Sequence, residues 1–342
     1  MKRFICILAA CLLLLGTLTG CSEKADYAIK VGDRTVSEND YYRTVMLLRS
    51  NYLSAEDAED SAEFWTEPLE DDSTTSEAFV DFINEYLIEK KLYSVQFDKL
   101  GLSFSESEES TIQNAIAEAV ESAGGMSAFT ATLTEANYTY EEYLEEIYDS
   151  TRKSKVLVHY FGEDGEDPVS LQDIKDYYNV HNALVKIVYV LKVDKETGEA
   201  LDTEGLAAAK EKAEDAYEAA TRPSDTDLFG DVIEIFSAST ADQGNGIVIS
   251  DDGSYDEKIS NAALDLEVGE VTLLDMETAY MVIKRYDGTA DDVFTATMQQ
   301  TTLETIRADE IEELLEQWEE ETSIKINKKI TKKYRPEKLV GQ

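Results

Sequence analysis

Few residues of this chain have side chains suited to acid–base, nucleophilic or metal chemistry. The chain contains two histidines, His159 and His181, and three cysteines, Cys6, Cys11 and Cys21. They are scattered along the sequence, and no Ser-His-Asp set, zinc-ligand spacing or P-loop motif occurs. We expect His159 to lie at a helix end and His181 to precede a strand without a catalytic role. The sequence therefore predicts no cofactor and no metal site.

Cys21 is the cysteine whose position predicts a modification. The chain begins with Lys2 and Arg3, continues with an apolar stretch at 4–15, and reaches Cys21 through Leu-Thr-Gly. A basic start, a short apolar core and small residues before a cleavage point are typical of a secretory signal. The small residues before the cysteine resemble a bacterial lipobox, in which the cysteine is acylated and becomes the first residue of the mature chain. We therefore expect residues 1–20 to be a lipoprotein signal peptide and Cys21 to anchor the protein at the cell membrane, on its extracytoplasmic face.

The composition of the mature chain argues against disulfides, nucleic-acid binding and disorder. Removal of residues 1–20 leaves Cys21 as the only thiol, so no disulfide is expected. The net charge is −41 before this removal, and a surface so acidic repels nucleic acid and anionic lipid. A hydrophobic content of 43% with 19 tyrosines nevertheless favours packed cores over disorder. The length is sufficient for two or three domains.

The first half of the mature chain has the pattern of a helical domain that begins with two short strands. Residues 27–36 predict strands on either side of a Gly32-Asp33 turn, and Ser37 is a good N-cap for the helix that follows. Residues 54–76 lack periodicity and are expected to form an acidic solvated loop, since the Asp-x-Asp-x-Asp-Gly spacing of a calcium loop is absent. Apolar residues at helical spacing or capping signals predict further helices around 79–101, 112–124, 126–135, 139–151 and 170–178.

The second half changes character near residue 184. β-branched residues at 184–193 predict a strand and an alanine-rich run at 206–220 predicts a helix. A glycine- and serine-rich loop, a helix at 255–266 and two strands at 270–274 and 279–286 complete a compact α+β unit. A single long helix is expected at 293–320.

The C-terminal tail reverses the charge of the chain. Between Lys325 and Lys338 there are seven basic residues and one acidic residue. One interpretation is an extended segment that pairs with the protein's own acidic face. The other is contact with anionic lipid or wall polymer.

These segments, in this order, resemble the PrsA/SurA family of extracytoplasmic foldases. The similar segments are Val31–Val36, Gly124–Phe129, Tyr140–Leu144 and Val169–Tyr178. The resemblance implies an α+β protein. It would have a mainly helical SurA-like chaperone domain at 21–180, an inserted parvulin-like β-α-α-β-β domain at 181–290, and a C-terminal helix and basic tail at 291–342 that pack on the chaperone domain.

The parvulin-like resemblance is carried best by two segments, Ala262–Val271 and Ala279–Lys284. Aligned with the family's pattern, Tyr189 and Met281 stand at the two histidine positions of the active centre. Ser239 stands at its acidic or cysteine position. Prolyl isomerisation needs no nucleophile, only a site that binds the twisted amide better than the planar one. Because all three polar elements differ, the resemblance implies a catalytically weak or inactive domain.

The expected function is that of a membrane-anchored folding factor whose partners are unfolded or newly secreted proteins. An active peptidyl-prolyl isomerase of the PrsA type is the first alternative, because Tyr189 could still donate a hydrogen bond. A ligand-binding or structural envelope lipoprotein is an alternative of another class, although the repeated βα units of solute-binding proteins are absent. No nucleic-acid partner is expected, and a dimer remains open.

Overall fold

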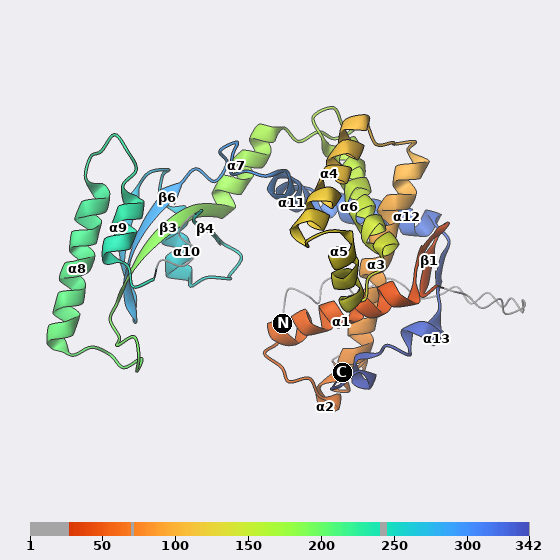
Figure 1. The fold of residues 1–342 in the computed structure, drawn as a ribbon, viewed down its shortest axis with the longest axis horizontal. Coiled ribbons are helices and arrows are strands. Elements are labelled where there is room, and N and C mark those ends of the chain that lie inside the picture. The colour runs from red at the N-terminus through yellow and green to blue at the C-terminus, as the bar shows by residue number, and fades with distance from the viewer. Residues whose placement is uncertain (1–26, 70–71, 240–244, 342) are drawn as a thin grey trace, which may run out of the picture. The chain divides into compact units, whose positions relative to one another are not determined.

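The computed structural model describes residues 27–69, 72–239 and 245–341 (Figure 1). The described chain divides into two compact units, one formed by residues 27–153 together with 317–341, and the other by residues 154–316. The predicted α+β class is confirmed. Residues 317–341 belong to the same unit as the N-terminal residues, whereas residues 291–316 belong to the second unit. The predicted domain limits at 180 and 290 stay a prediction. Cys21 and the predicted signal peptide lie outside the described residues.

The first unit contains a small antiparallel sheet built from both ends of the described chain. Its strands are β1 (Ile29–Val31), β2 (Arg34–Val36) and β7 (Ile324–Ile326), in the order β2-β1-β7. Gly32 has φ of +60° at the turn between β1 and β2, a conformation that favours glycine. The two predicted N-terminal strands are therefore present.

Helices make up the rest of the first unit, and side-chain caps define where they start. Ser37 accepts a hydrogen bond from the Asp40 amide at 2.9 Å, and the Thr139 hydroxyl accepts one from the Glu142 amide at 3.1 Å. The helices are α1 (Glu38–Ala55), α2 (Ala62–Trp65), α3 (Thr75–Lys99), α4 (Glu106–Ser122), α5 (Met126–Glu135) and the first part of α6 (Tyr140–Phe161).

The expectation of a solvated loop at 54–76 is wrong in part. The short helix α2 lies inside this segment, and the side chain of Trp65 is fully buried. Its ring stacks on Tyr52 at 5.8 Å and contacts Phe79 at 5.3 Å between ring centroids. A single turn of helix is too short for its apolar residues to show a helical period. The sequence pattern therefore predicted neither α2 nor the packing of Trp65.

The second unit is organised around a four-stranded antiparallel sheet. The strands are β3 (Asn182–Leu191), β4 (Ile247–Ser250), β5 (Val271–Asp275) and β6 (Ala279–Tyr286), in the order β4-β3-β6-β5. Helices α8 (Thr203–Thr221) and α9 (Phe229–Phe236) lie side by side on one face, and α10 (Glu257–Leu264) packs with the apolar side chains of the other (Figure 1). Neither α9 nor β4 was expected: β4 lies within the segment whose glycine and serine content predicted a loop, and the N-cap position of α9, Leu228, provides no side-chain cap.

The expected single helix at 293–320 is two helices. It breaks at Arg307, which has φ of −110° and ψ of 25° between α11 (Ala296–Ile306) and α12 (Ala308–Glu321). In the second unit α11 packs against α7 (Leu171–His181), and the rings of Phe294 and Tyr178 lie 5.0 Å apart. In the first unit Trp318 packs edge-on against Tyr93 at 5.6 Å. Two helices with different partners replace the continuous apolar stripe that the sequence suggested.

The basic tail pairs in part with the acidic residues of its own unit, as one interpretation of the sequence predicted. After β7 it forms α13 (Lys328–Thr331) and a 3₁₀ turn, η2 (Pro336–Lys338). Lys333 lies 2.6 Å from Glu38 and Arg335 lies 3.3 Å from Glu77.

Candidate functional site

Two of the three positions predicted from the parvulin-like resemblance face each other in the sheet of the second unit. Tyr189 of β3 is the direct cross-strand partner of Met281 of β6. On its other side, Met281 is paired with Leu274 of the edge strand β5. Directly opposite residues in an antiparallel pair have Cβ atoms about 4.5–5.5 Å apart. Tyr189, Met281 and Leu274 therefore form one row across three strands, which we call the apolar row.

The apolar row lies on the face of the sheet that packs with α10. Met281 is only 5% exposed, whereas Tyr189 and Leu274 are half-buried. The same cluster includes Met276 from the β5–β6 turn and Ile259 from α10. Side chains on the opposite face of the sheet pack instead with α8 and α9. The row thus ends in partly exposed side chains at the edge of the α10 face.

Tyr189 is the one side chain of the apolar row with a polar group. Burial raises the pKa of its phenol, and the neighbouring Tyr255 raises it further. The phenol is therefore protonated at neutral pH and can donate a hydrogen bond. Met281 offers a weak thioether acceptor and Leu274 offers none, so the row contains no general acid or base that titrates near neutral pH.

Ser239 lies near the apolar row through its backbone segment. The Ser237 hydroxyl accepts a hydrogen bond from the Tyr189 amide at 3.0 Å, and the Ala238 amide donates to the Tyr189 carbonyl at 2.7 Å. The Ser237 hydroxyl also donates to the Ser239 carbonyl at 2.6 Å. These bonds hold the segment that follows α9 against β3. The structure thus brings the segment of Ser239 beside Tyr189, while the Ser239 side chain itself is exposed.

The two histidines lie elsewhere in the second unit. His181 ends α7, eight residues before Tyr189, and its Nδ1 is 2.7 Å from an Asp251 carboxylate oxygen. His159 lies in the last turn of α6, 3.5 Å from Glu166. Within the described ranges, no group of three or more His, Cys, Asp or Glu side chains is arranged to hold a metal ion. No helix there is both long and apolar enough to span a bilayer.

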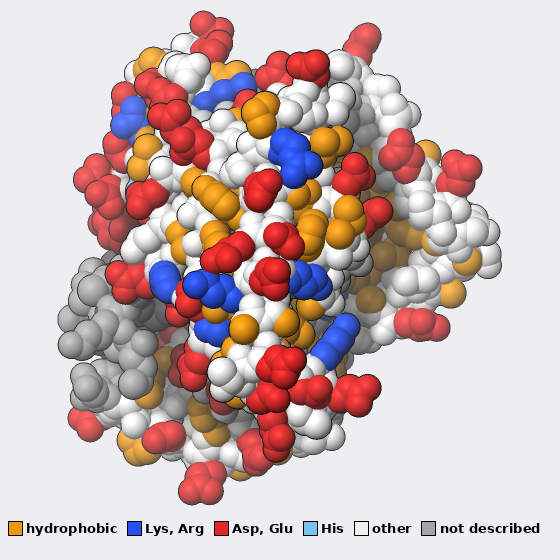
Figure 2. Space-filling view, turned by 90° about the vertical axis from the view of Figure 1, so that its left-hand side faces the viewer, with side chains coloured by type: hydrophobic (Ala, Val, Ile, Leu, Met, Phe, Trp, Pro, Cys, Tyr) orange, Lys and Arg blue, Asp and Glu red, His pale blue; other side chains and the backbone are white. Residues whose placement is uncertain are grey.

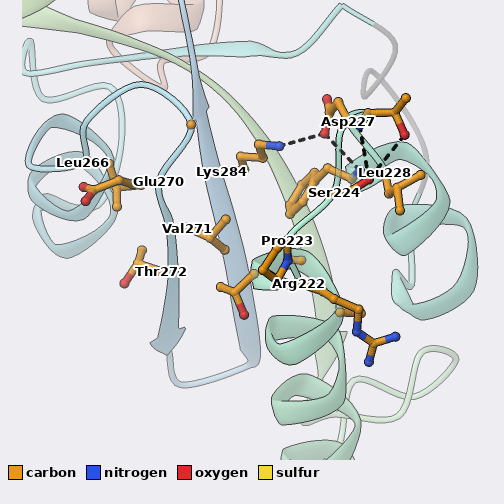
Figure 3. Close-up of a pocket in the computed structure, with 16 residues that line it drawn as sticks. Arg222, Pro223, Ser224, Asp227, Leu228, Leu266, Glu270, Val271, Thr272 and Lys284 are labelled. Atoms are coloured by element: carbon orange, nitrogen blue, oxygen red, sulfur yellow. Dashed lines mark hydrogen bonds and ion pairs between the residues drawn. The ribbon is translucent and has the colours of Figure 1, made fainter.

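A pocket of about 520 Å³ opens on the α8 and α9 side of the sheet (Figure 3). Its central polar feature is Asp227, which lies 2.7 Å from the Lys284 ammonium and accepts a hydrogen bond from the Tyr286 hydroxyl at 2.8 Å. Partial burial opposes ionisation, but the hydrogen bonds from Lys284 and Tyr286 lower the pKa of Asp227 overall. The same carboxylate accepts from the Phe229 amide at 3.1 Å, so it fixes the start of α9 to β6.

This pocket was not expected from the sequence. Both carboxylate oxygens of Asp227 have partners in the protein, so the group is structural rather than open to a ligand. The Lys-x-Tyr spacing on β6 puts Lys284 and Tyr286 on one face of the strand, but nothing in the sequence pairs them with an aspartate 57 residues earlier. The pocket is therefore separate from the apolar row, which lies on the other face of the sheet.

Comparison with known proteins gives matches among solved structures alone, since no protein-family model and no curated protein sequence matches this chain. The foldase PrsA from Streptococcus pneumoniae is 16% identical, with a TM-score of 0.34, over 71% of this chain and 84% of that one. PrsA from Lactococcus lactis is 13% identical, with a TM-score of 0.34, over 91% and 98%. A structure of SurA-like chaperones from Campylobacter jejuni is 11% identical, with a TM-score of 0.30, over 88% and 99%.

Proposed function

We propose that this protein is a membrane-anchored extracytoplasmic folding factor that binds unfolded or newly secreted proteins and has little or no prolyl isomerase activity. The observation that supports this best is the apolar row. At two of the three positions where the resemblance implies a polar active centre, the sheet presents Tyr189 and Met281, and Leu274 of β5 continues the row. Such a row offers contact area to apolar side chains of a client rather than hydrogen bonds to a reacting amide.

The composition of the row suits weak and varied clients. Met276, a half-buried neighbour of the row in the same cluster, contributes a flexible, polarisable thioether, which adapts to irregular partners. An apolar contact binds the planar and the twisted amide about equally, and uniform binding of this kind does not accelerate a reaction. Binding without catalysis is therefore the expected behaviour.

The test is an aggregation-suppression assay on the protein that starts at residue 21, with a reduced, unfolded client. Leu274→Lys places a charge at the exposed end of the apolar row on an edge strand, and we expect it to reduce suppression several-fold. Leu273→Lys is the matched control, because Leu273 is the next residue of the same strand, is also half-buried and packs on the opposite face.

Equal loss in both variants would point to destabilised β5 rather than to a client site. No suppression by the unmodified protein would favour the ligand-binding or structural alternative.

An active isomerase is the second candidate, favoured by the protonated phenol of Tyr189. It predicts that a proline-limited refolding reaction is accelerated by the unmodified protein and slowed by Tyr189→Phe. The proposed function predicts the same low rate for both proteins.

Anchoring through Cys21 is also part of the proposal, and it has its own test. Because the mature chain has no other thiol, Cys21→Ala should leave the protein unlipidated and no longer retained in the detergent phase of a cell extract. Cys11→Ala, in the predicted signal segment, is the control that should be lipidated normally. Normal processing and detergent partitioning of Cys21→Ala would show that the anchor lies elsewhere.

A further inference from the structure

Two lysines face each other on the outer side of the sheet in the first unit. Lys30 of β1 is directly opposite Lys325 of β7. The neighbouring residues Ile29 and Val31 are fully buried, so the alternation of the strand directs Lys30 away from the core. Like charges directly opposite in a sheet destabilise it. The pair therefore places two ammonium groups side by side on the face of the sheet that points away from the core.

Two more lysines follow within seven residues. Lys328 and Lys332 are four residues apart across α13 and its C-cap, so they project from the same side of this turn. We call Lys30, Lys325, Lys328 and Lys332 the lysine patch. Among the described residues, none of the four has a carboxylate within ion-pair distance, although Lys333 and Arg335 of the same tail do.

The lysine patch lies where the N-terminal segment enters the fold. Asn327, between Lys325 and Lys328, donates a hydrogen bond from its side chain to the Tyr27 carbonyl at 3.2 Å. Its amide donates to the Ala28 carbonyl at 2.8 Å. Cys21 is six residues before Tyr27, and six residues span at most about 22 Å when fully extended. A lipid on Cys21 therefore keeps this part of the unit close to the membrane surface.

We propose that the lysine patch binds the phosphate headgroups of anionic phospholipids and acts as a second attachment beside the lipid on Cys21. The inference rests on the proposed anchor for its location and on charge complementarity for its ligand. Basic residues next to a membrane anchor gain affinity for an anionic leaflet with each added charge. Two attachment signals hold a protein at a membrane more firmly than one, and they also fix which face it presents.

The acidic charge of the whole chain does not prevent this contact. The Debye length at physiological ionic strength is about 8 Å, so carboxylates far from the membrane are largely screened. Lysines in direct contact with headgroups are screened much less. The patch therefore acts locally on a molecule whose net charge is −41.

The test is co-sedimentation of the unlipidated protein, residues 22–342, with vesicles of phosphatidylcholine alone or mixed with phosphatidylglycerol. We expect binding only to the mixed vesicles, weakening as salt is added. Lys325→Gln, Lys328→Gln and Lys332→Gln combined should weaken it roughly a hundredfold, from about a five-fold effect for each lysine. The matched control replaces Lys195, Lys210 and Lys212 by Gln, which are exposed in the second unit and give the same net charge.

Three results would overturn the proposal: equal binding by the patch variant and the unmodified protein, equal weakening by the control triple, or no binding to either vesicle. Binding to a soluble polyol-phosphate wall polymer without binding to vesicles would also exclude the lipid surface. Aggregation suppression by the patch variant should stay unchanged, so failure here is distinguishable from failure of the proposed function.

Discussion

At the scale of single residues, the pairing of Tyr189 with Met281 combines a half-buried phenol with a buried thioether. A fully buried polar group without a partner costs roughly 1–3 kcal/mol. Because Tyr189 is only half-buried, its hydroxyl avoids most of this cost while its ring packs in the apolar cluster.

A buried ion pair in the first unit is the residue-scale feature with the clearest effect on stability. The Asp149 side chain is 1% exposed and the Lys91 side chain 6%, and their charged atoms lie 2.5 Å apart. Asp149 also accepts from the Ser94 hydroxyl at 2.5 Å and from Arg152 at 2.8 Å. Burial alone would raise the pKa of Asp149, but the charge of Lys91 and these hydrogen bonds outweigh it and lower the pKa. The folded state therefore holds this carboxylate ionised.

We predict that Asp149→Asn lowers the free energy of unfolding by about 3–5 kcal/mol at neutral pH, because it leaves buried positive charge without its partner. Since the folded pKa lies below the unfolded value of about 3.9, the stabilisation by Asp149 is complete above that value. It is lost as the pH falls toward the folded pKa. Urea unfolding at pH 7 and near pH 3 should show the difference from the unmodified protein shrink with acid.

Glu321→Gln is the control for this prediction, because its pair with Lys99 is exposed and 3.8 Å long. We expect little change at either pH. A difference for Asp149→Asn that is independent of pH would mean that the substitution acts through packing instead of charge.

At the scale of elements, the sequence predicted those helices and strands that carry their own signals. Ser37 and Ser170 cap the helices where expected, and the Gly32 turn joins two strands. The break at Arg307 could not be predicted, because apolar residues at helical spacing lie on both sides of it in the sequence. For the candidate site, the pairing of Tyr189 with Met281 follows from the aligned strands. That Leu274 belongs to the same row could not be predicted, because the alternation of residues in one sequence does not fix the pairing register of β5.

The prediction at the scale of elements concerns the end of α12, where the chain returns to the first unit. Trp318 is 3% exposed and packs against Tyr93 of α3. Trp318→Ala should lower the free energy of unfolding of this unit by about 3–5 kcal/mol, the usual cost of removing a buried aromatic ring. Hydrogen exchange of the amides of α3 and β1 reports on this unit selectively.

Trp318→Phe keeps a ring at this position and should cost clearly less. If the amides of α3 and β1 exchange equally fast in all three proteins, the end of α12 does not complete the first unit.

At the scale of the whole molecule, the main feature is the acidic net charge. Carboxylates outnumber lysine and arginine side chains over the face seen in Figure 2, and the chain total is −41. Such a charge opposes association between copies of the chain. Under the proposed function it also favours basic segments among unfolded clients. In that proposal the acidic charge adds a preference for basic segments to an apolar row that discriminates little between apolar ones.

The second unit contains a smaller part that we expect to fold alone, residues 181–290. The sheet has an apolar cluster on each face, and every residue of both clusters lies between Ala183 and Ile283. Arg285 would lose its hydrogen bond to the Asn179 carbonyl but keep those to Leu264 and Leu266 at 2.7 and 2.8 Å. The isolated segment therefore retains its core and most of its polar contacts.

Our last prediction is that this isolated segment folds cooperatively but catalyses prolyl isomerisation at least about a hundredfold more slowly than an intact parvulin. Loss of one polar group that acts in a transition state typically reduces the rate by about 10² to 10³. Here Tyr189, Ser239 and Met281 occupy all three polar positions that the resemblance implies. Circular dichroism during urea unfolding measures the fold, and a proline-containing peptide assay measures kcat/KM. Tyr189→His combined with Met281→His restores two of the positions on the same pair of strands, so its rate should exceed that of either single variant. A segment that folds and equals an ordinary parvulin in kcat/KM without these changes would contradict the binding-only site and make the isomerase the better assignment.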